Sequence, residues 1–454
     1  MLVQFTVGNY RSFKDEATLS MVASNIDEHP EQVLKGAQRR QVNLLRAAGI
    51  FGANASGKSN LIRAMAAAKD MVVNGTRSGA AIRDVTPFRL DPACLSQPST
   101  FDFVIDLDGK LYSYGFAVTS QTVLEEWLFV REPTKDKDVM WYERTTAESG
   151  EVKVRFGKAL VSEGKSGKDF LGFVARGTRP NQLFLTEALD RNVEELRRVR
   201  GWFDSLTFIP AEAYYPFQLL AHDHGNFATF LRGLLKTAGT GIDSITTEET
   251  PLDLEGHLPG LAREVKDQIS SLGSGERMAV ELPAGLQVIL GTGDGSATLI
   301  VARAQHQTAN GGTVTFDIEE ESSGTRRLMQ LAPSLFVMQH SESVFVIDEL
   351  ERSLHPLLCR KFLEVALSEG RRPNSQLVFS THNTDLLDDI MRRDEIWLIE
   401  KGEDGASHLR SLAEFDIRPD IQIRKGYLNG RFGAIPLISD LPESDAEMAP
   451  ENSR

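Results

Sequence analysis

The chain has 454 residues, enough for roughly three domain-sized units, and its apolar fraction of 41% and charged fraction of 25% are typical of a globular protein with a core. It carries 50 Lys and Arg against 64 Asp and Glu, and the net charge of −14 argues against binding DNA by bulk positive charge, although a local basic stripe stays open. The two cysteines, Cys94 and Cys359, lack metal-ligand spacing, which argues against a disulfide scaffold and a structural zinc site. The opening residues do not have the pattern of a signal peptide, and no apolar run has membrane-spanning length, so we expect a cytoplasmic protein with no membrane partner.

The first third of the chain predicts strands around one helix. Alternating apolar residues over 1–22 predict a short hairpin, and the apolar run 43–51 predicts a strand that ends in a glycine-rich loop. Residues 59–73 have helical spacing and good helix formers. From 99 to 160 the pattern returns to strands, with a hairpin turn at Asp108-Gly109.

Beyond residue 160 the pattern becomes mixed. Residues 161–168 are loop-like, 180–200 and 226–238 predict helices, and 278–318 predicts strands. From 324 onward the order is helix, strand, helix, strand. We therefore expect an N-terminal lobe, an inserted lid or dimerisation region, a C-terminal lobe and an acidic disordered tail, over residues 1–160, 161–310, 311–436 and 437–454 respectively.

A complete phosphate-loop motif follows the strand at 43–51. Gly52 to Ser59 reads GANASGKS and fits G-x-x-x-x-G-K-[ST], and the strand before it and helix after it are the context that the motif requires. Backbone N–H groups of this loop and the positive end of the helix would surround phosphates. Lys58 would reach the β and γ phosphates, and the Ser59 hydroxyl would bind Mg²⁺.

Two further apolar strands end in polar side chains. Residues 343–347 are followed by Asp348 and Glu349. Asp348 is placed for a second Mg²⁺ contact and Glu349 for orienting or deprotonating the water that attacks the γ phosphate, although such a pair alone would be interpreted as a helix cap. The strand at 376–381 ends at His382, which we expect to be a neutral hydrogen-bond donor beside the γ phosphate.

The order of these elements resembles the ABC-type ATPase heads of the SMC, RecF and Rad50 group. The sequence GANASGKSN is similar to that group's phosphate loop and departs from it at Ala55, where glycine is usual. The resemblance implies that nucleotide is bound by loop residues Gly52, Asn54, Ser56, Gly57, Lys58, Ser59 and Asn60. The stretch NYRSF resembles the group's N-F-R-S, which would place Arg11 near the nucleotide. In ESSGT, Ser322 and Gly324 match the serine and glycine of the signature loop.

The resemblance implies an α/β fold, namely an ABC-type (SMC/RecF-like) P-loop ATPase head with mixed β-sheet lobes and a compact inserted lid. No heptad run is present, so we expect no long coiled coil. Within the group the chain looks most like the compact AAA15/AAA21 ATPases of the overcoming-lysogenization-defect and abortive-infection type, including the ATPase of PARIS anti-phage systems. The residues that carry this likeness are the opening stretch, Pro87-Phe88 with the hairpin after it, and Gly426 to Pro436.

These features predict an ATP- and Mg²⁺-dependent ATPase that acts as a switch in anti-phage defence. The short stretch after His382 lacks spaced carboxylates of a nuclease, so we expect a separate toxin or nuclease effector and a phage-encoded trigger. One phosphate loop and one signature loop per chain imply a homodimer, or a higher oligomer of dimers, in which Ser322 completes the partner's site. A RecF- or Rad50-like ATPase that clamps DNA, and a stand-alone housekeeping NTPase, are the alternatives, and the sequence does not decide between ATP and GTP.

Overall fold

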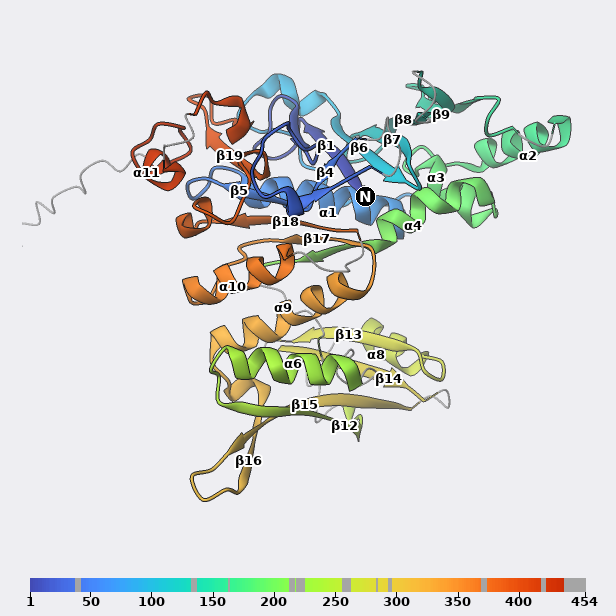
Figure 1. Ribbon diagram of the computed structural model, residues 1–454. Helices are drawn as coiled ribbons and strands as arrows, with labels where there is room; N and C mark the ends of the chain where they lie inside the picture. The colour runs from blue at the N-terminus through green and yellow to red at the C-terminus, as the bar shows by residue number, and fades with distance from the viewer. Residues whose placement is uncertain are drawn as a thin grey trace, which may run out of the picture.

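The computed structural model describes residues 1–36, 42–131, 137–161, 164–211, 217, 225–254, 263–282, 285–292, 296–368, 374–417 and 422–436. These residues form three sheets of five to seven strands and one two-stranded sheet, stacked with helices in layers (Figure 1). No described helix is long and apolar enough to cross a membrane. The tail predicted over 437–454 lies outside the described residues.

An antiparallel sheet of seven strands covers one side of the molecule. Its order is β10-β9-β8-β7-β6-β1-β2. The strands are β1 (Leu2–Gly8), β2 (Ala17–Ser20), β6 (Ser99–Leu107), β7 (Lys110–Val118), β8 (Val123–Arg131), β9 (Val139–Thr146) and β10 (Val152–Phe156). Strands β6 and β7 are joined through Asp108 and Gly109, with φ angles of 52° and 82°. Positive φ at both turn residues matches the twist of the strands, which is why Asp-Gly predicted this hairpin correctly.

The central sheet has six strands in the order β11-β17-β18-β5-β19-β20. They are β5 (Ala47–Phe51), β11 (Leu206–Ile209), β17 (Ser343–Ile347), β18 (Ser375–Thr381), β19 (Ile396–Lys401) and β20 (Ser407–Ser411). The strands from β11 to β19 run parallel, and β20 is antiparallel to β19. β5 and β17 are fully buried apolar runs, as expected for parallel strands covered on both faces.

Alternate residues of β5 belong to two different cores, one on each face of the central sheet. Ala48 and Ile50 pack in the first core, which lies around α1 (Lys58–Asn74) and the seven-stranded sheet. Ala47 and Phe51 pack in the second core, with α9 (Ser323–His340) and α10 (Pro356–Leu367). This alternation is the one expected of a strand whose two faces are both covered.

The remaining elements lie around these layers. Helices α2 (Gly164–Gly177), α3 (Phe184–Asp190) and α4 (Arg197–Ser205) contribute to the first core. The third sheet has the order β12-β15-β14-β13, with β16 paired to β15, and lies beyond α6 (Figure 1). The elements not yet given are α6 (Gly225–Thr237), β12 (Ile242–Pro251), α8 (Arg263–Ser270), β13 (Arg277–Leu282), β14 (Gly285–Gly291), β15 (Ala297–Gln307), β16 (Thr313–Asp317), α11 (Ile423–Leu428), β3 (Val33–Leu34) and β4 (Leu44–Leu45).

The α/β class with mixed β-sheet lobes is confirmed. The longest described helix, α9, has 18 residues, so the described part of the chain contains no coiled-coil arm. The loop predicted over 161–168 is wrong from Gly164 onward, where α2 begins. Its glycines suggested a loop, but burial of Leu171 and Val174 in the first core stabilises the helix. The domain division stays a prediction, and β11, within the predicted lid, pairs with β17 of the central sheet.

Candidate functional site

Three adjacent parallel strands end at one edge of the central sheet, and each is followed by a predicted functional segment. β5 continues into the loop Gly52–Gly57, β17 is followed by Asp348, and β18 is followed by His382. Because β18 lies between β17 and β5, their carboxyl ends bring these segments together. Ligands of open parallel sheets bind outside this edge, so the fold places the site where the chemistry requires it.

The ammonium of Lys58 lies inside the loop. Its Nζ donates to the carbonyl oxygens of Gly52 at 2.9 Å and Ala53 at 3.0 Å, and lies 3.5 Å from Nδ1 of His382. The side chain is buried, and desolvation lowers the pKa of Lys58 to about 8. A buried ammonium with only neutral acceptors gains much from an incoming anion, so this geometry favours phosphate binding.

Neighbouring segments hold the loop from outside. Ser407 of β20 donates from Oγ to the carbonyl of Ser56 at 2.5 Å, and Asn60 donates to Oγ of Ser12 at 2.9 Å. A Cβ on Gly57 would lie 2.3 Å from Ser407 Oγ, and the φ of Gly57 is 117°, so this position requires glycine. At Ala55 the φ is 60°, which explains why glycine is favoured there in the resembling loops.

Oxygen atoms suited to a divalent cation meet beside the loop. Ser59 Oγ donates to Asp348 Oδ1 at 3.1 Å, and Ser380 Oγ donates to the same oxygen at 2.5 Å. Hydroxyl and carboxylate oxygens are what Mg²⁺ prefers, and Mg²⁺ usually takes few protein ligands beside phosphates and water. The donor set therefore fits this cation, with Ser59 and Asp348 as ligands and Ser380 orienting the carboxylate.

Glu349 and His382 follow the same two strands that carry this oxygen cluster. The φ of Glu349 is 49°, its amide donates to Ser380 Oγ at 2.8 Å, and its half-exposed carboxylate lies 3.4 Å from Arg352. The His382 amide donates to Glu351 Oε1 at 2.5 Å. Burial and the nearby Lys58 lower the pKa of His382, so its ring is neutral at pH 7.

The structure does not bring every predicted residue to this cluster. Ser322 caps α9, accepting from the Thr325 amide at 3.1 Å, and is exposed. A Cβ on Gly324 would lie 2.7 Å from the Ser353 carbonyl, so the signature loop packs against the turn after β17. Arg11 donates to the Tyr10 hydroxyl at 3.1 Å. Within the described part of the chain, no hydrogen bond or ion pair joins Ser322, Arg11 or the exposed Asn54 to Lys58, and their nucleotide contacts stay predictions.

The sequence analysis missed several residues that shape the site, namely Ser12, Arg327, Glu351, Ser380 and Ser407. Four of these lie within three residues of a predicted site residue, since Ser12 follows Arg11, Arg327 follows Gly324, Glu351 follows Glu349 and Ser380 precedes His382. Their spacing could therefore have indicated them. Ser407 reaches the site only through a tertiary contact.

Arg327 supports the turn that carries the acidic pair. Its guanidinium is buried, which lowers its pKa to about 10. It donates to the carbonyl oxygens of Pro210 at 3.2 Å, Asp348 at 3.0 Å and Glu349 at 3.3 Å. The turn at the end of β17 is therefore fixed from α9 by a charged donor.

Replacing Arg327 by alanine should destabilise the protein. We expect Arg327→Ala to lower the free energy of unfolding by about 3 kcal/mol, because three carbonyl oxygens, that of the buried Asp348 among them, lose charge-assisted donors. Urea unfolding followed by circular dichroism measures this change. Arg360→Ala, at an exposed ion pair on α10, is the control and should cost no more than about 0.5 kcal/mol. Equal unfolding midpoints for the two variants would contradict the supporting role.

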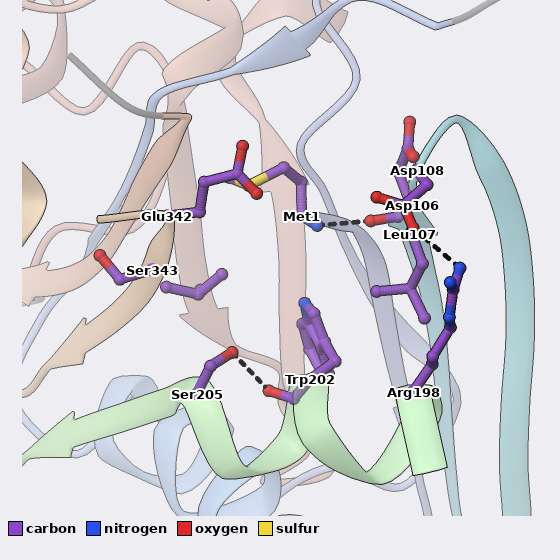
Figure 2. Close-up of a pocket in the computed structure, with 10 residues that line it drawn as sticks. Met1, Asp106, Leu107, Asp108, Arg198, Trp202, Ser205, Glu342 and Ser343 are labelled. Carbon is purple, nitrogen blue, oxygen red and sulfur yellow. Dashed lines mark hydrogen bonds and ion pairs between the residues drawn. The ribbon is translucent and has the colours of Figure 1, made fainter. Parts of the chain in front are cut away.

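A separate cavity lies at the opposite edge of the central sheet, where β17 begins. It has a volume of about 390 Å³, and Figure 2 shows its lining from the β6–β7 turn, α4 and the start of β17. Two of its cationic groups already have partners, since the Met1 ammonium donates to the Asp106 carbonyl at 2.6 Å and Arg198 pairs with Asp108 at 2.9 Å. Because Asp348 follows the other end of β17, this cavity is not the phosphate site.

Comparisons with known proteins agree with the geometry at the level of family. The family model AAA_21, described as "AAA domain, putative AbiEii toxin, Type IV TA system", matches residues 47–388, which include the loop, Asp348 and His382. The SMC head domain from Thermotoga maritima is similar at a TM-score of 0.36 and 10% identity, over 90% of this chain and 98% of that one. An SMC head bound to the C-winged helix domain of ScpA has a TM-score of 0.41 and 12% identity, over 91% and 99%. The curated proteins gave no match.

Proposed function

Because this chain belongs to the AAA_21 family, we propose that it is a magnesium-dependent ATPase that acts as a nucleotide-gated switch in anti-phage, abortive-infection defence and controls a separate effector protein. The observation that carries the ATPase part is the convergence of Lys58, the Ser59–Asp348 pair and His382 at the ends of three adjacent strands. Each of these groups has the chemistry that a bound nucleoside triphosphate requires.

In this proposal each residue of the site has a separate role in hydrolysis. Lys58 leaves the carbonyls of the loop and binds the β and γ phosphates. Ser59 and Asp348 would hold the magnesium ion, and the chemistry that it would supply is neutralisation of charge on the phosphates. Glu349 orients and deprotonates the attacking water, and the neutral ring of His382 donates to the γ phosphate. The loop backbone and the positive end of α1 supply the remaining N–H donors.

The proposed assembly is a homodimer, or a higher oligomer of dimers, with shared sites. Ser322 is exposed at the start of α9, and among the described residues no hydrogen bond or ion pair joins Ser322 or Gly324 to Lys58 of the same chain. A signature loop exposed in this way is available to a second copy. ATP would close two copies around the nucleotide, and hydrolysis would separate them, which gives a two-state element that can hold or release a partner.

The defence role rests on the family description, which names an AbiEii toxin and a type IV toxin–antitoxin system. A switch of this kind needs an effector that damages the cell and a trigger that signals infection. We propose a toxin or nuclease as the effector and a phage product as the trigger. Membership of a PARIS system is the most specific form of this proposal.

Two measurements test the proposal. Phosphate release is measured with Mg²⁺ and ATP, with and without duplex DNA, at low and high salt. Turnover that is indifferent to DNA, together with a neighbouring toxic gene product that co-purifies with the protein, is the expected result. Turnover stimulated several-fold by DNA, with binding lost as salt rises, would replace the switch by a DNA-clamping ATPase. Absence of turnover under all conditions would overturn the ATPase itself.

A further inference from the structure

Glu351 connects the turn after β17 with the segment after β18. It lies three residues after Asp348, in a turn closed by hydrogen bonds from the Arg352 amide to the Glu349 carbonyl and from the Leu354 amide to the Glu351 carbonyl. From this turn its Oε1 accepts the His382 amide at 2.5 Å. The contact is short and charge-assisted, so it fixes the backbone from which the His382 ring extends.

The second oxygen of the same carboxylate has no partner among the described residues. Glu351 Oε2 is buried and accepts no hydrogen bond. A buried polar atom without a partner costs about 1–3 kcal/mol, and such atoms are rare in folded proteins. A side chain needed only to tie two turns together could have used an amide or a hydroxyl, which need not bury a carboxylate.

The negative charge of Glu351 acts on both groups that are expected to bind phosphate. Among the charges that raise the pKa of Lys58, Glu351 has the largest effect, ahead of Asp348 and Glu349. Glu351 likewise opposes the lowering of the His382 pKa more than any other charge. The carboxylate is therefore coupled electrostatically to both side chains, although neither motif includes it.

We propose that Glu351 is a positioning residue of the hydrolytic site, which fixes His382 by accepting a hydrogen bond from its backbone amide. This inference rests on the proposed ATPase function. Glu351 does not touch the reacting phosphate itself. It sets the place of the histidine that does, so its loss should lower turnover more than nucleotide affinity.

Substitutions at Glu351 separate the loss of its negative charge from the loss of its hydrogen bond with the His382 amide. In Glu351→Gln, the amide oxygen can still accept the His382 N–H while the negative charge is lost. Glu351→Ala removes both. We expect Glu351→Ala to reduce kcat about 10- to 100-fold with the Kd for ATP within about threefold of wild type, and Glu351→Gln to recover most of kcat. Glu364→Ala, at an exposed glutamate of α10, is the matched control and should behave as wild type.

A double-mutant cycle with His382→Ala tests whether Glu351 acts through the histidine. If it does, adding Glu351→Ala to His382→Ala should change kcat by less than about twofold, because the group being positioned is already absent. Equal losses of kcat in the two backgrounds would overturn the inference. So would Glu351→Ala turning over at the wild-type rate.

A measurement without nucleotide keeps this test independent of the ATPase proposal. In protein labelled with ¹³C-histidine, the ring signal of His382 is identified by its loss in His382→Ala. Glu351→Ala should shift that signal, whereas Glu364→Ala should leave it in place. An unshifted His382 signal would overturn the inference even if wild type proves inactive. A shifted signal without ATP turnover in wild type would contradict only the ATPase function.

Discussion

Glu349→Gln is expected to bind ATP with nearly wild-type affinity and to turn it over at less than about one hundredth of the wild-type rate, since general-base assistance contributes about 10²- to 10⁴-fold. The carboxylate follows β17, is half exposed and is the one acidic side chain of the Asp-Glu pair not bonded to Ser59. Replacing it by an isosteric amide removes the base and leaves the phosphate contacts. The closed assembly should therefore accumulate, because ATP binds and is not consumed.

Phosphate release, equilibrium ATP binding and light scattering after size exclusion measure these three effects on one preparation. With ATP and Mg²⁺, Glu349→Gln should elute at twice the wild-type subunit mass or a multiple of it. Glu364→Gln is the matched control, because its glutamate is exposed on α10 and lies in ion pairs with Arg360 and Lys361. Turnover in Glu349→Gln above about a tenth of wild type would remove Glu349 as the general base.

Local sequence predicts those parts of the site whose residue pattern lies entirely within one continuous segment. Gly52 to Ser59 is one such segment, because glycine spacing, the preceding strand and the following helix are all local. Asp348 and His382 were predictable because buried parallel strands end at one edge, so polar residues at their ends must meet.

The site residues that the sequence does not predict depend on contacts between segments that are far apart in the chain. Arg327 lies on α9, and its sequence neighbours give no sign that it binds the carbonyls at the end of β17. Ser407 donates a hydrogen bond to the carbonyl of Ser56, although most of the sequence separates the two residues. The periodicity of apolar residues predicts which face of α9 is buried. It does not predict which carbonyl oxygens the guanidinium of a buried arginine will bind.

Backbone conformation explains one departure from the expected motif. Ala55 occupies a left-handed position at which glycine would be unstrained, and the strain costs about 1–2 kcal/mol. Ser12, Ser407 and the buried glycine at 57 hold the rest of the loop firmly enough to impose this conformation. The loop shape is thus determined by its surroundings as well as by its own glycines.

Lys58→Ala is expected to weaken ATP binding about 10- to 100-fold, because a charge-assisted bond to phosphate contributes about 1.5–3 kcal/mol. It should also lower the free energy of unfolding, because the carbonyl oxygens of Gly52 and Ala53 lose their charged donor. Thermal unfolding with and without Mg²⁺-ATP measures both effects, and the ATP-induced shift in the unfolding temperature should disappear.

Lys69→Ala, on the same helix, is the matched control. Its Nζ donates to the Leu206 carbonyl at 2.5 Å, so this variant should unfold more easily and keep its ATP-induced shift. If Lys58→Ala keeps the shift as well, the lysine inside the loop is not the phosphate ligand, and the triphosphate must bind elsewhere on the sheet edge.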